Sequence, residues 1–357
     1  MATRYRPETK VDPRRYFESV VAPRDATAQS PPVCVYLETT NRCNLLCTTC
    51  PRTYEELEPP ADMSWGLFTS IVDQLPRLQR AVLHGVGEPM LVKKLPDMVR
   101  YLKQRGVYVL FNTNGTLLNE RNGRALIAAG LDELRVSLDA ANARSFRAIR
   151  GKDYFNRIVR NVRSFRDLQE REGKELPRVS AWLTGLKETI AELPAFVKLA
   201  AEIGVREVYL QRLVFFEHDA IGHARPDQAL YEKINREEAG YLEEATKLAH
   251  SYGISFGASG AATEPGLSLK RDPTAGSPWS LCRRPWTLMY FTANGRALPC
   301  CIAPFSKRGY EHYTLGEATQ QSLQEIWNGP GYRAFRQALL SDKPPASCAG
   351  CGLRWSL

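Results

Sequence analysis

Short runs of apolar and β-branched residues recur along the first two thirds of the chain, separated by stretches in which apolar positions have helical spacing. These runs predict six strands. They are VCVYLETT (33–40), RAVLHG (80–85), VYVLFN (107–112), ELRVSL (133–138), RVSAWLT (178–184) and REVYLQRL (206–213). Strands that alternate with helices favour parallel βαβ units, so we expect an α/β fold with its chemistry at the C-terminal ends of the strands.

Helix boundary signals agree with this alternation. Ser64 precedes an amphipathic stretch and is a candidate N-cap. Gly106, Gly130 and Gly204 each follow a stretch with helical spacing, where a glycine commonly ends a helix. The pattern therefore predicts helices between successive strands.

Composition divides the chain into four segments. Residues 1–32 are rich in Pro, Arg and Ser and form an extension, and residues 33–215 hold the strand–helix alternation. Residues 216–276 read as one long helix followed by a Gly/Ser/Pro-rich connector, which indicates a domain boundary. Residues 277–357 carry five of the nine cysteines and are expected to form a second, smaller domain.

The bulk composition is that of a globular protein, with 43% hydrophobic residues. No stretch approaches the roughly 20 apolar residues that cross a bilayer. The charged N-terminus lacks the apolar region of a secretory signal. We therefore expect a cytoplasmic protein with no membrane partner, in which cysteines are more readily metal ligands than disulfides.

The net charge of +9 allows two interpretations. A basic surface would meet nucleic acid or an anionic substrate, whereas scattered charge would only be solvated. Lys and Arg are spread along the chain among acidic neighbours, with no dense basic run. The sequence thus favours scattered charge, and a nucleic-acid partner is not expected.

The segment ETTNRCNLLCTTCPR directly follows the first predicted strand and places Cys43, Cys47 and Cys50 in C-x3-C-x2-C spacing. Three thiolates in one loop suit three irons of a cubane cluster and leave a fourth iron open. Alternatives are a zinc knuckle or buried thiols, but structural zinc usually has four protein ligands and no fourth Cys or His lies nearby. Cys34, inside the strand, is expected in the core.

With this motif the sequence resembles the radical S-adenosylmethionine (SAM) superfamily. The resemblance implies a partial (β/α)6 TIM-like barrel whose three cysteines hold a [4Fe–4S] cluster. In that family the open iron binds SAM, and reductive cleavage of SAM gives a 5′-deoxyadenosyl radical that abstracts hydrogen from a substrate carbon. It also implies an electron donor of the flavodoxin or ferredoxin type.

Further family positions fall at the ends of successive predicted strands. HGVGEP (84–89) looks like the family's Gly-Gly-Glu element, which would place Gly87 and Glu88 beside the methionine amino group of SAM. The other candidates for contacts to SAM or substrate are Asn114, Ser137, Asp139, Leu210 and Gln211. One departure is Thr49, because the residue before the third cysteine is often aromatic in this superfamily.

A second group of cysteines lies near the C-terminus, around a predicted hairpin, LMYFTANGRALPCC, that turns at Asn294–Gly295. This region resembles the SPASM/twitch domains of radical SAM enzymes, and the shorter twitch form fits best. That resemblance implies one auxiliary [4Fe–4S] cluster ligated by Cys282, Cys300, Cys348 and Cys351. Spacing alone also permits a four-cysteine zinc site.

Cys301 is left over beside a predicted cluster ligand. It is either a buried thiol, the commoner fate of a lone cysteine, or a hydrogen-atom donor of the kind that radical SAM epimerases use. The second option favours epimerisation of a sugar or aminocyclitol-like small molecule. The alternative is a dehydrogenase that oxidises an alcohol to a ketone through the auxiliary cluster.

Other functional classes remain open. Peptide modification is less favoured, because residues 1–32 are too short for a leader-binding domain and no second auxiliary cluster is expected. An RNA-modifying enzyme or a non-enzymatic metal scaffold are further alternatives. His84, His218 and His312 are candidate acids or bases, and Glu217 and Asp219 are candidate substrate contacts.

Overall fold

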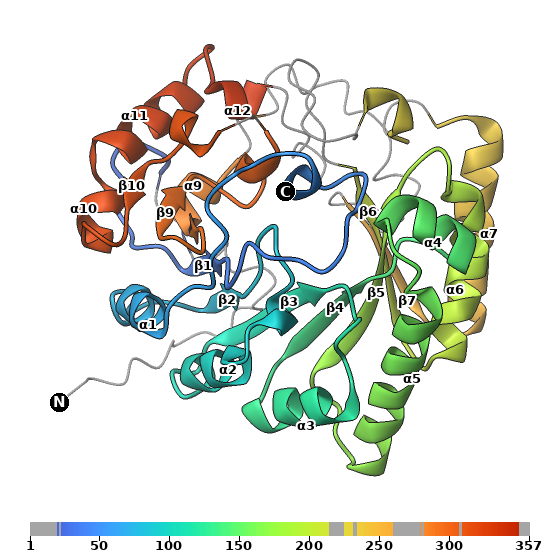
Figure 1. Ribbon diagram of the computed structural model, residues 1–357. Helices are drawn as coiled ribbons and strands as arrows, with labels where there is room; N and C mark the ends of the chain where they lie inside the picture. The colour runs from blue at the N-terminus through green and yellow to red at the C-terminus, as the bar shows by residue number, and fades with distance from the viewer. Residues whose placement is uncertain are drawn as a thin grey trace.

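The computed structural model describes residues 20, 23–213, 225–230, 234–259, 279, 282–306 and 309–349. Within these residues ten strands form one sheet (Figure 1). They are β1 (Cys34–Leu37), β2 (Arg80–Val82), β3 (Tyr108–Thr113), β4 (Glu133–Ser137), β5 (Arg178–Gly185), β6 (Glu207–Arg212), β7 (Ser255–Ala258), β8 (Leu288–Phe291), β9 (Arg296–Leu298) and β10 (Gly316–Glu317). Their order across the sheet is β10-β9-β8-β1-β2-β3-β4-β5-β6-β7.

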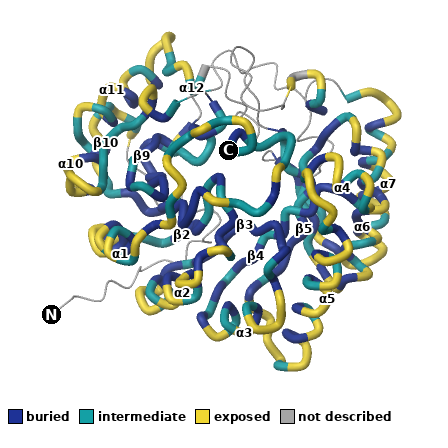
Figure 2. The backbone as a smooth tube through the Cα atoms, viewed as in Figure 1, coloured by how far each residue is buried: buried dark blue, intermediate teal, exposed yellow. Residues whose placement is uncertain are grey.

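Helices alternate with the parallel strands and then follow the hairpin. The α-helices are α1 (Trp65–Asp73), α2 (Leu95–Lys103), α3 (Glu120–Ala129), α4 (Ala143–Arg150), α5 (Phe155–Arg171), α6 (Leu193–Glu202), α7 (Arg236–Ser251), α9 (Arg284–Thr287), α10 (Leu323–Trp327), α11 (Pro330–Leu339) and α12 (Ala346–Ala349). Figure 1 shows α2, α3, α5, α6 and α7 on the outer side of the curved sheet. Figure 2 shows mostly buried strands and, around them, helices whose outer faces are exposed.

The six strands predicted from the sequence are all present and parallel, which confirms the partial-barrel fold. The structure adds β7, which pairs in parallel with β6 after helix α7. Residues 216–276 were expected to hold only a helix and a linker, so part of that segment extends the barrel instead. The strand was missed because SFGA is short and contains a glycine, which strand patterns disfavour.

The C-terminal hairpin continues the same sheet. Strand β8 pairs in parallel with β1, with Tyr290 opposite Tyr36, and it pairs antiparallel with β9. The predicted turn at Asn294–Gly295 is confirmed, and Gly295 has a φ of 97°, which favours glycine. Pairing with β1 places the C-terminal domain directly beside the strand that precedes the first cysteine loop.

Two predicted helix ends are also confirmed. The Ser64 side chain accepts a hydrogen bond from the Leu67 backbone N–H at 3.1 Å and caps α1. Helix α3 ends at Gly130, whose φ of 80° is left-handed. None of the described helices is both long and apolar enough to cross a membrane.

The described part of the N-terminal extension packs on the C-terminal domain. The indole N–H of Trp286 donates to the Asp25 carbonyl at 2.7 Å, and that of Trp327 donates to the Ser30 carbonyl at 2.9 Å. Arg336 is fully buried in α11 and donates to the Ala26 carbonyl at 3.3 Å. These contacts hold the segment before β1 against α9, α10 and α11.

Candidate active site

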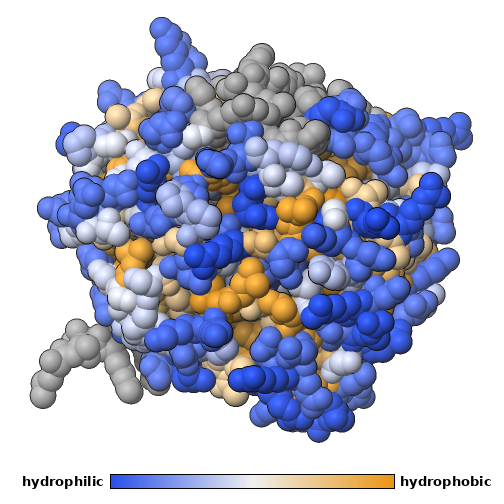
Figure 3. All heavy atoms as spheres, in the orientation of Figure 1, coloured by the Kyte–Doolittle hydropathy of each residue, from blue (hydrophilic) through white to orange (hydrophobic). Residues whose placement is uncertain are grey.

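A cavity of about 480 Å³ lies where the parallel strands end. It brings together most of the site residues predicted from the sequence: Cys43, Cys47, Cys50, Gly87, Glu88, Asn114, Ser137, Asp139, Gln211 and Cys301. Leu210 does not line it, because successive strand residues point to opposite faces and Leu210 points into the core. On the face shown in Figure 3, hydrophilic residues dominate and apolar residues gather toward the middle.

The remaining predicted residues lie elsewhere. Cys282, Cys300 and Cys348 are outside the cavity wall. Cys351 and the loop candidates Glu217, His218 and Asp219 fall outside the described residues. His312 is paired with Glu311 at 3.6 Å in the C-terminal domain and does not line the cavity.

The three cysteines of the first loop line the cavity, and N–H groups donate hydrogen bonds to two of their sulfur atoms. The Leu45 backbone N–H and the Arg150 side chain each donate at 3.5 Å, to Cys43 Sγ and Cys47 Sγ respectively. Burial and the nearby Cys47 raise the pKa of Cys50 to about 12. Free thiols would therefore stay protonated here, whereas iron binds the thiolate form and would offset that cost.

The end of helix α4 supports this loop. The backbone N–H of Leu46 donates to the Arg150 carbonyl at 3.3 Å, and that of Thr48 donates to the Ile149 carbonyl at 2.8 Å. Gly151 has a φ of 71°, and a Cβ there would lie 2.4 Å from the Leu46 carbonyl oxygen. The close approach of the two backbones thus requires a glycine at the end of α4.

Arg150 links the cysteine loop to β4 and was not singled out from the sequence. Its guanidinium is paired with Asp139 at 2.5 Å and donates to Cys47. Burial opposes the charge, but Asp139 and the cysteines more than offset it, so the pKa of Arg150 is raised. Asp139 has a left-handed φ of 59° and also accepts from the Thr184 backbone N–H at 2.7 Å. Asp139 therefore positions a cation beside the cysteines.

Glu88 is buried at the cavity wall and organises the strand ends. Its carboxylate accepts from the Thr113 hydroxyl at 2.8 Å and from the backbone N–H groups of Met90 and Asn114 at 3.0 and 2.7 Å. Burial nevertheless raises the pKa of Glu88. A carboxylate has about four lone-pair positions, so room for a further donor from the cavity remains.

The wall is closely packed at Gly87, and a buried acceptor at Asn112 fits SAM as the ligand. A Cβ at Gly87 would lie 2.1 Å from the Thr40 carbonyl oxygen. The two backbone segments therefore pack too closely for any residue but glycine at position 87. Asn112 Oδ1 is buried and has no hydrogen-bond partner among the described residues, and Asn112 lines the cavity. An unpaired buried acceptor is costly unless a ligand donor meets it. The amino and hydroxyl groups of SAM supply such donors.

Aromatic and basic side chains form another part of the wall, which the sequence reading also missed. The rings of Trp182 and Tyr209 stack with centroids 4.1 Å apart, and the Arg135 guanidinium lies 4.5 Å from the Trp182 ring. Ser137, on the same strand as Arg135, is opposite Trp182 in the sheet register. No local motif identifies this platform, because its members come from three adjacent strands.

His84 also lines the cavity. Its Nδ1 accepts from the Asn112 backbone N–H at 3.1 Å, and its ring meets Tyr36 edge-on at 5.8 Å. Burial, with Arg135 and Arg80 nearby, lowers the pKa of His84 to about 3. The imidazole is therefore neutral near pH 7, with its proton on Nε2.

The adjacent cysteines Cys300 and Cys301 of the C-terminal domain have different surroundings. Burial raises the pKa of Cys282 to about 11, and the nearby Cys300 contributes to the rise. Cys301 instead lines the cavity, where the Arg284 side chain donates to its Sγ at 2.8 Å. Cys301 thus lines the same cavity as the barrel cysteines, whereas Cys300, which contributes to the raised pKa of Cys282, a predicted fellow ligand, does not.

Within the described residues, no three His, Cys, Asp or Glu side chains converge on one metal-ion position. A cubane cluster differs from a single ion, because each of its thiolate ligands binds a separate iron. The cysteine sets therefore fit clusters through the chemistry of their sulfur donors.

Comparison with known proteins agrees with this geometry. Residues 37–200 match the sequence profile of the radical SAM superfamily, and residues 282–352 match that of the SPASM iron–sulfur cluster-binding domain. The chain belongs to the radical SAM superfamily. As a radical SAM enzyme with a SPASM domain, it uses [4Fe–4S] clusters and SAM.

Relatives of this radical SAM chain extend over most of its length. It is 25% identical to the tungsten-containing aldehyde ferredoxin oxidoreductase cofactor-modifying protein of Pyrococcus furiosus, over 90% of this chain and 87% of that protein. It is also 25% identical to the PqqA peptide cyclase of Gluconobacter oxydans, over 91% of this chain and 84% of that one. The SAM-bound structure of SuiB from Streptococcus suis has the same fold, with a TM-score of 0.68 at 16% identity over 91% of this chain and 74% of SuiB.

Proposed function

We propose that this enzyme modifies a peptide by radical chemistry, forming a new bond at a substrate carbon. The observation that carries the proposal is the match to a peptide cyclase over 91% of this chain. A mycofactocin maturase supports it, with 30% identity over 48% of this chain. None of the relatives named here is a sugar epimerase, so the sugar or aminocyclitol substrate expected from the sequence gives way to a peptide.

The cysteines divide the work between two regions. Cys43, Cys47 and Cys50 would hold the cluster that binds SAM. Cys282, Cys300, Cys348 and Cys351 would hold an auxiliary cluster. When bound, the first cluster and SAM supply a 5′-deoxyadenosyl radical that removes a hydrogen atom from the substrate.

Other wall residues would orient the ligands. Gly87 and Glu88 would meet the methionine end of SAM, and Asn112 Oδ1 would accept one of its N–H or O–H groups. The stacked rings of Trp182 and Tyr209 offer a flat face for a substrate side chain, and Arg135 adds a positive charge beside it.

Co-expression with candidate short peptides, followed by mass spectrometry, tests this function. The probes are the peptides encoded by small reading frames beside the gene, each incubated with reconstituted enzyme, SAM and a flavodoxin or ferredoxin. We expect one peptide to lose the mass of two hydrogen atoms with matching 5′-deoxyadenosine. SAM cleavage that consumes no peptide, together with turnover of a small molecule, would contradict the proposal.

A second candidate, epimerisation, is favoured by the position of Cys301. Cys301 lines the same cavity as the barrel cysteines, and the Arg284 side chain donates to its Sγ at 2.8 Å. A product of unchanged connectivity that carries solvent deuterium at carbon would support it. Loss of that deuterium in Cys301→Ala, with both clusters retained, would assign the donor.

A further inference from the structure

A fully buried carboxylate lies directly behind the cavity wall. Glu38 follows the last residue of β1 and has no exposed surface. Its Oε2 accepts from the Val86 backbone N–H and from the Tyr290 hydroxyl, each at 2.9 Å, and its Oε1 accepts from the Ala293 backbone N–H at 3.2 Å. Glu38 thus joins β1, the turn after β2 and the hairpin strand β8.

Tyr290 connects this carboxylate to the cavity. Tyr290 and Gly85 both line the cavity wall, whereas Glu38 lies one hydroxyl behind it. A Cβ at Gly85 would lie 2.1 Å from Glu38 Oε2 and 2.5 Å from the Tyr290 hydroxyl. Only a glycine therefore lets the phenol and the carboxylate pair this close to the cavity.

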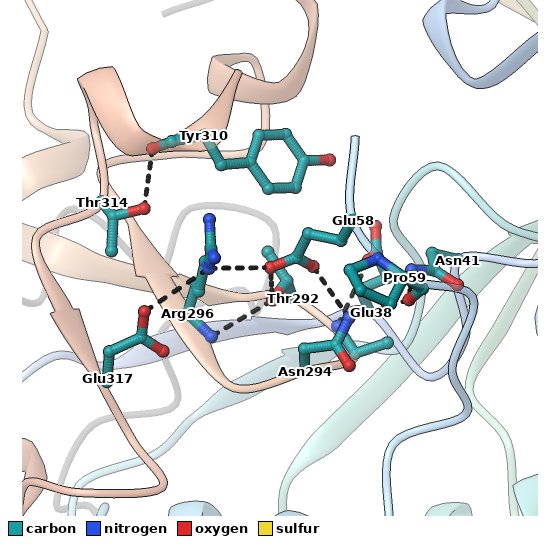
Figure 4. A network of polar contacts seen from close by, with 11 residues as sticks. Glu38, Asn41, Glu58, Pro59, Thr292, Asn294, Arg296, Tyr310, Thr314 and Glu317 are labelled. Carbon is teal, nitrogen blue, oxygen red and sulfur yellow. Dashed lines mark hydrogen bonds and ion pairs between the residues drawn. The ribbon is translucent and has the colours of Figure 1, made fainter. Parts of the chain in front are cut away.

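The charges around Glu38 do not neutralise it. Within the described residues no ion pair to Glu38 is formed, and its hydrogen bonds come from two backbone N–H groups and the Tyr290 hydroxyl. Arg296 pairs with Glu58 at 3.1 Å and with Glu317 at 3.4 Å (Figure 4). Among the described residues the buried hydroxyl of Tyr310 has no hydrogen-bond partner, and burial together with the negative charge of Glu38 raises its pKa.

Burial is the main influence on the pKa of Glu38. It raises the pKa of Glu38 to about 7, and the negative charge of Glu58 adds to the rise, while the hydrogen bonds from Val86, Tyr290 and Ala293 oppose it. The carboxyl group is therefore able to change protonation state near neutral pH, which is the property required of a proton acceptor.

We propose that Glu38 accepts a proton from the cavity through Tyr290. An acidic X–H group of the substrate gives its proton to the Tyr290 oxygen as Tyr290 gives its own to Glu38 Oε2. One X–H bond breaks, one O–H bond forms on Glu38, and no electron changes hands in this step. The inference rests on the proposed peptide modification only for the identity of the X–H group.

Infrared titration of the substrate-free holoenzyme tests the acceptor independently of any substrate. The wild-type protein should show a protonated-carboxyl band, absent from Glu38→Gln, that disappears with a midpoint near pH 7. Glu58→Gln is the matched control, because it removes the neighbouring charge without touching Tyr290. Its midpoint should move to lower pH. A Glu38 that stays ionised throughout the titration, or an unmoved midpoint in Glu58→Gln, would overturn the proposal.

A pH profile of product formation tests the relay. The wild-type rate should fall as pH drops through about 7, because protonated Glu38 accepts nothing. Tyr290→Phe should lower the rate by about 10²-fold and lose this dependence. Tyr310→Phe removes a hydroxyl that is not bonded to Glu38 and should keep both.

A Tyr290→Phe enzyme with the wild-type rate and profile would refute the relay. If the wild-type enzyme modifies no peptide, the proposed function fails by itself, and the infrared midpoint still decides whether Glu38 is a proton acceptor.

Discussion

The two cysteine regions of this enzyme are built in different ways. Cys43, Cys47 and Cys50 lie in one loop, which is held by the end of helix α4 and by Arg150. The C-terminal cysteines come from separate segments, before α9, after β9 and in α12. That region depends on the pairing of β8 with β1 and on the N-terminal segment clamped against Trp286.

The first site therefore depends on one local loop, whereas the second depends on the assembly of the whole fold. Damage to one should therefore leave the other in place. The cavity is lined by the barrel cysteines and by Cys301 of the C-terminal domain.

The largest effect is expected from Cys47→Ala. Loss of one of three thiolates should abolish 5′-deoxyadenosine formation and lower iron by about four atoms per chain. Iron analysis and a SAM-cleavage assay measure this. Cys34→Ala, which changes a core thiol outside the cavity, is the control and should retain both. A normal 5′-deoxyadenosine yield from Cys47→Ala would refute the assignment of the first site.

The reciprocal change is Cys348→Ala. It should also remove about four irons, but SAM cleavage should persist because the barrel loop is untouched. The two variants together test whether the regions are independent. Iron at the wild-type level in Cys348→Ala would show that this cysteine is no cluster ligand.

A smaller effect is expected from Arg150→Gln. The change leaves the buried Asp139 carboxylate without its cation, which typically costs about 3–5 kcal/mol of unfolding free energy. Loss of a positive charge beside Cys47 should also lower the reduction potential of the first cluster only. Arg147→Gln, on the exposed face of the same helix, should change stability by less than about 0.5 kcal/mol. Equal effects of the two variants on stability and potential would contradict the role of Arg150.

The smallest effect is expected on the pH dependence of stability, through His84, which lines the cavity. Its pKa is about 3 in the fold and 6.5 when unperturbed, so the unfolded chain binds more protons as pH falls below 6.5. The free energy of unfolding should therefore fall by roughly 1 kcal/mol over the first pH unit below 6.5. Denaturant unfolding of wild type and His84→Gln measures it, and the variant should show the shallower loss. Identical slopes would show that His84 is not buried in its neutral form.

Local patterns predicted much of this molecule. Apolar alternation located β1 to β6, and the spacing of Cys43, Cys47 and Cys50 predicts the first cluster site, because both signals lie within a few consecutive residues. The Asn294–Gly295 turn was also predicted from adjacent residues, whereas the ligand role of the C-x2-C pair stays a prediction because Cys351 lies outside the described residues.

Features that need distant segments escaped the sequence. Arg150 carries no motif, and its importance comes from Asp139 and Cys47 meeting it in the fold. The pairing of Glu38 with Tyr290 depends on β8 lying beside β1, far along the chain. Leu210 was assigned to the cavity from family position alone, and the alternation of β6 directs it to the core.

Iron and sulfide analysis after anaerobic reconstitution, with 5′-deoxyadenosine assayed after dithionite and SAM, tests the central claim most directly. Two independent cluster sites predict about eight irons per chain together with SAM cleavage. About four irons with zinc in the C-terminal domain would contradict the claim of two clusters, and no iron with no cleavage would contradict both sites.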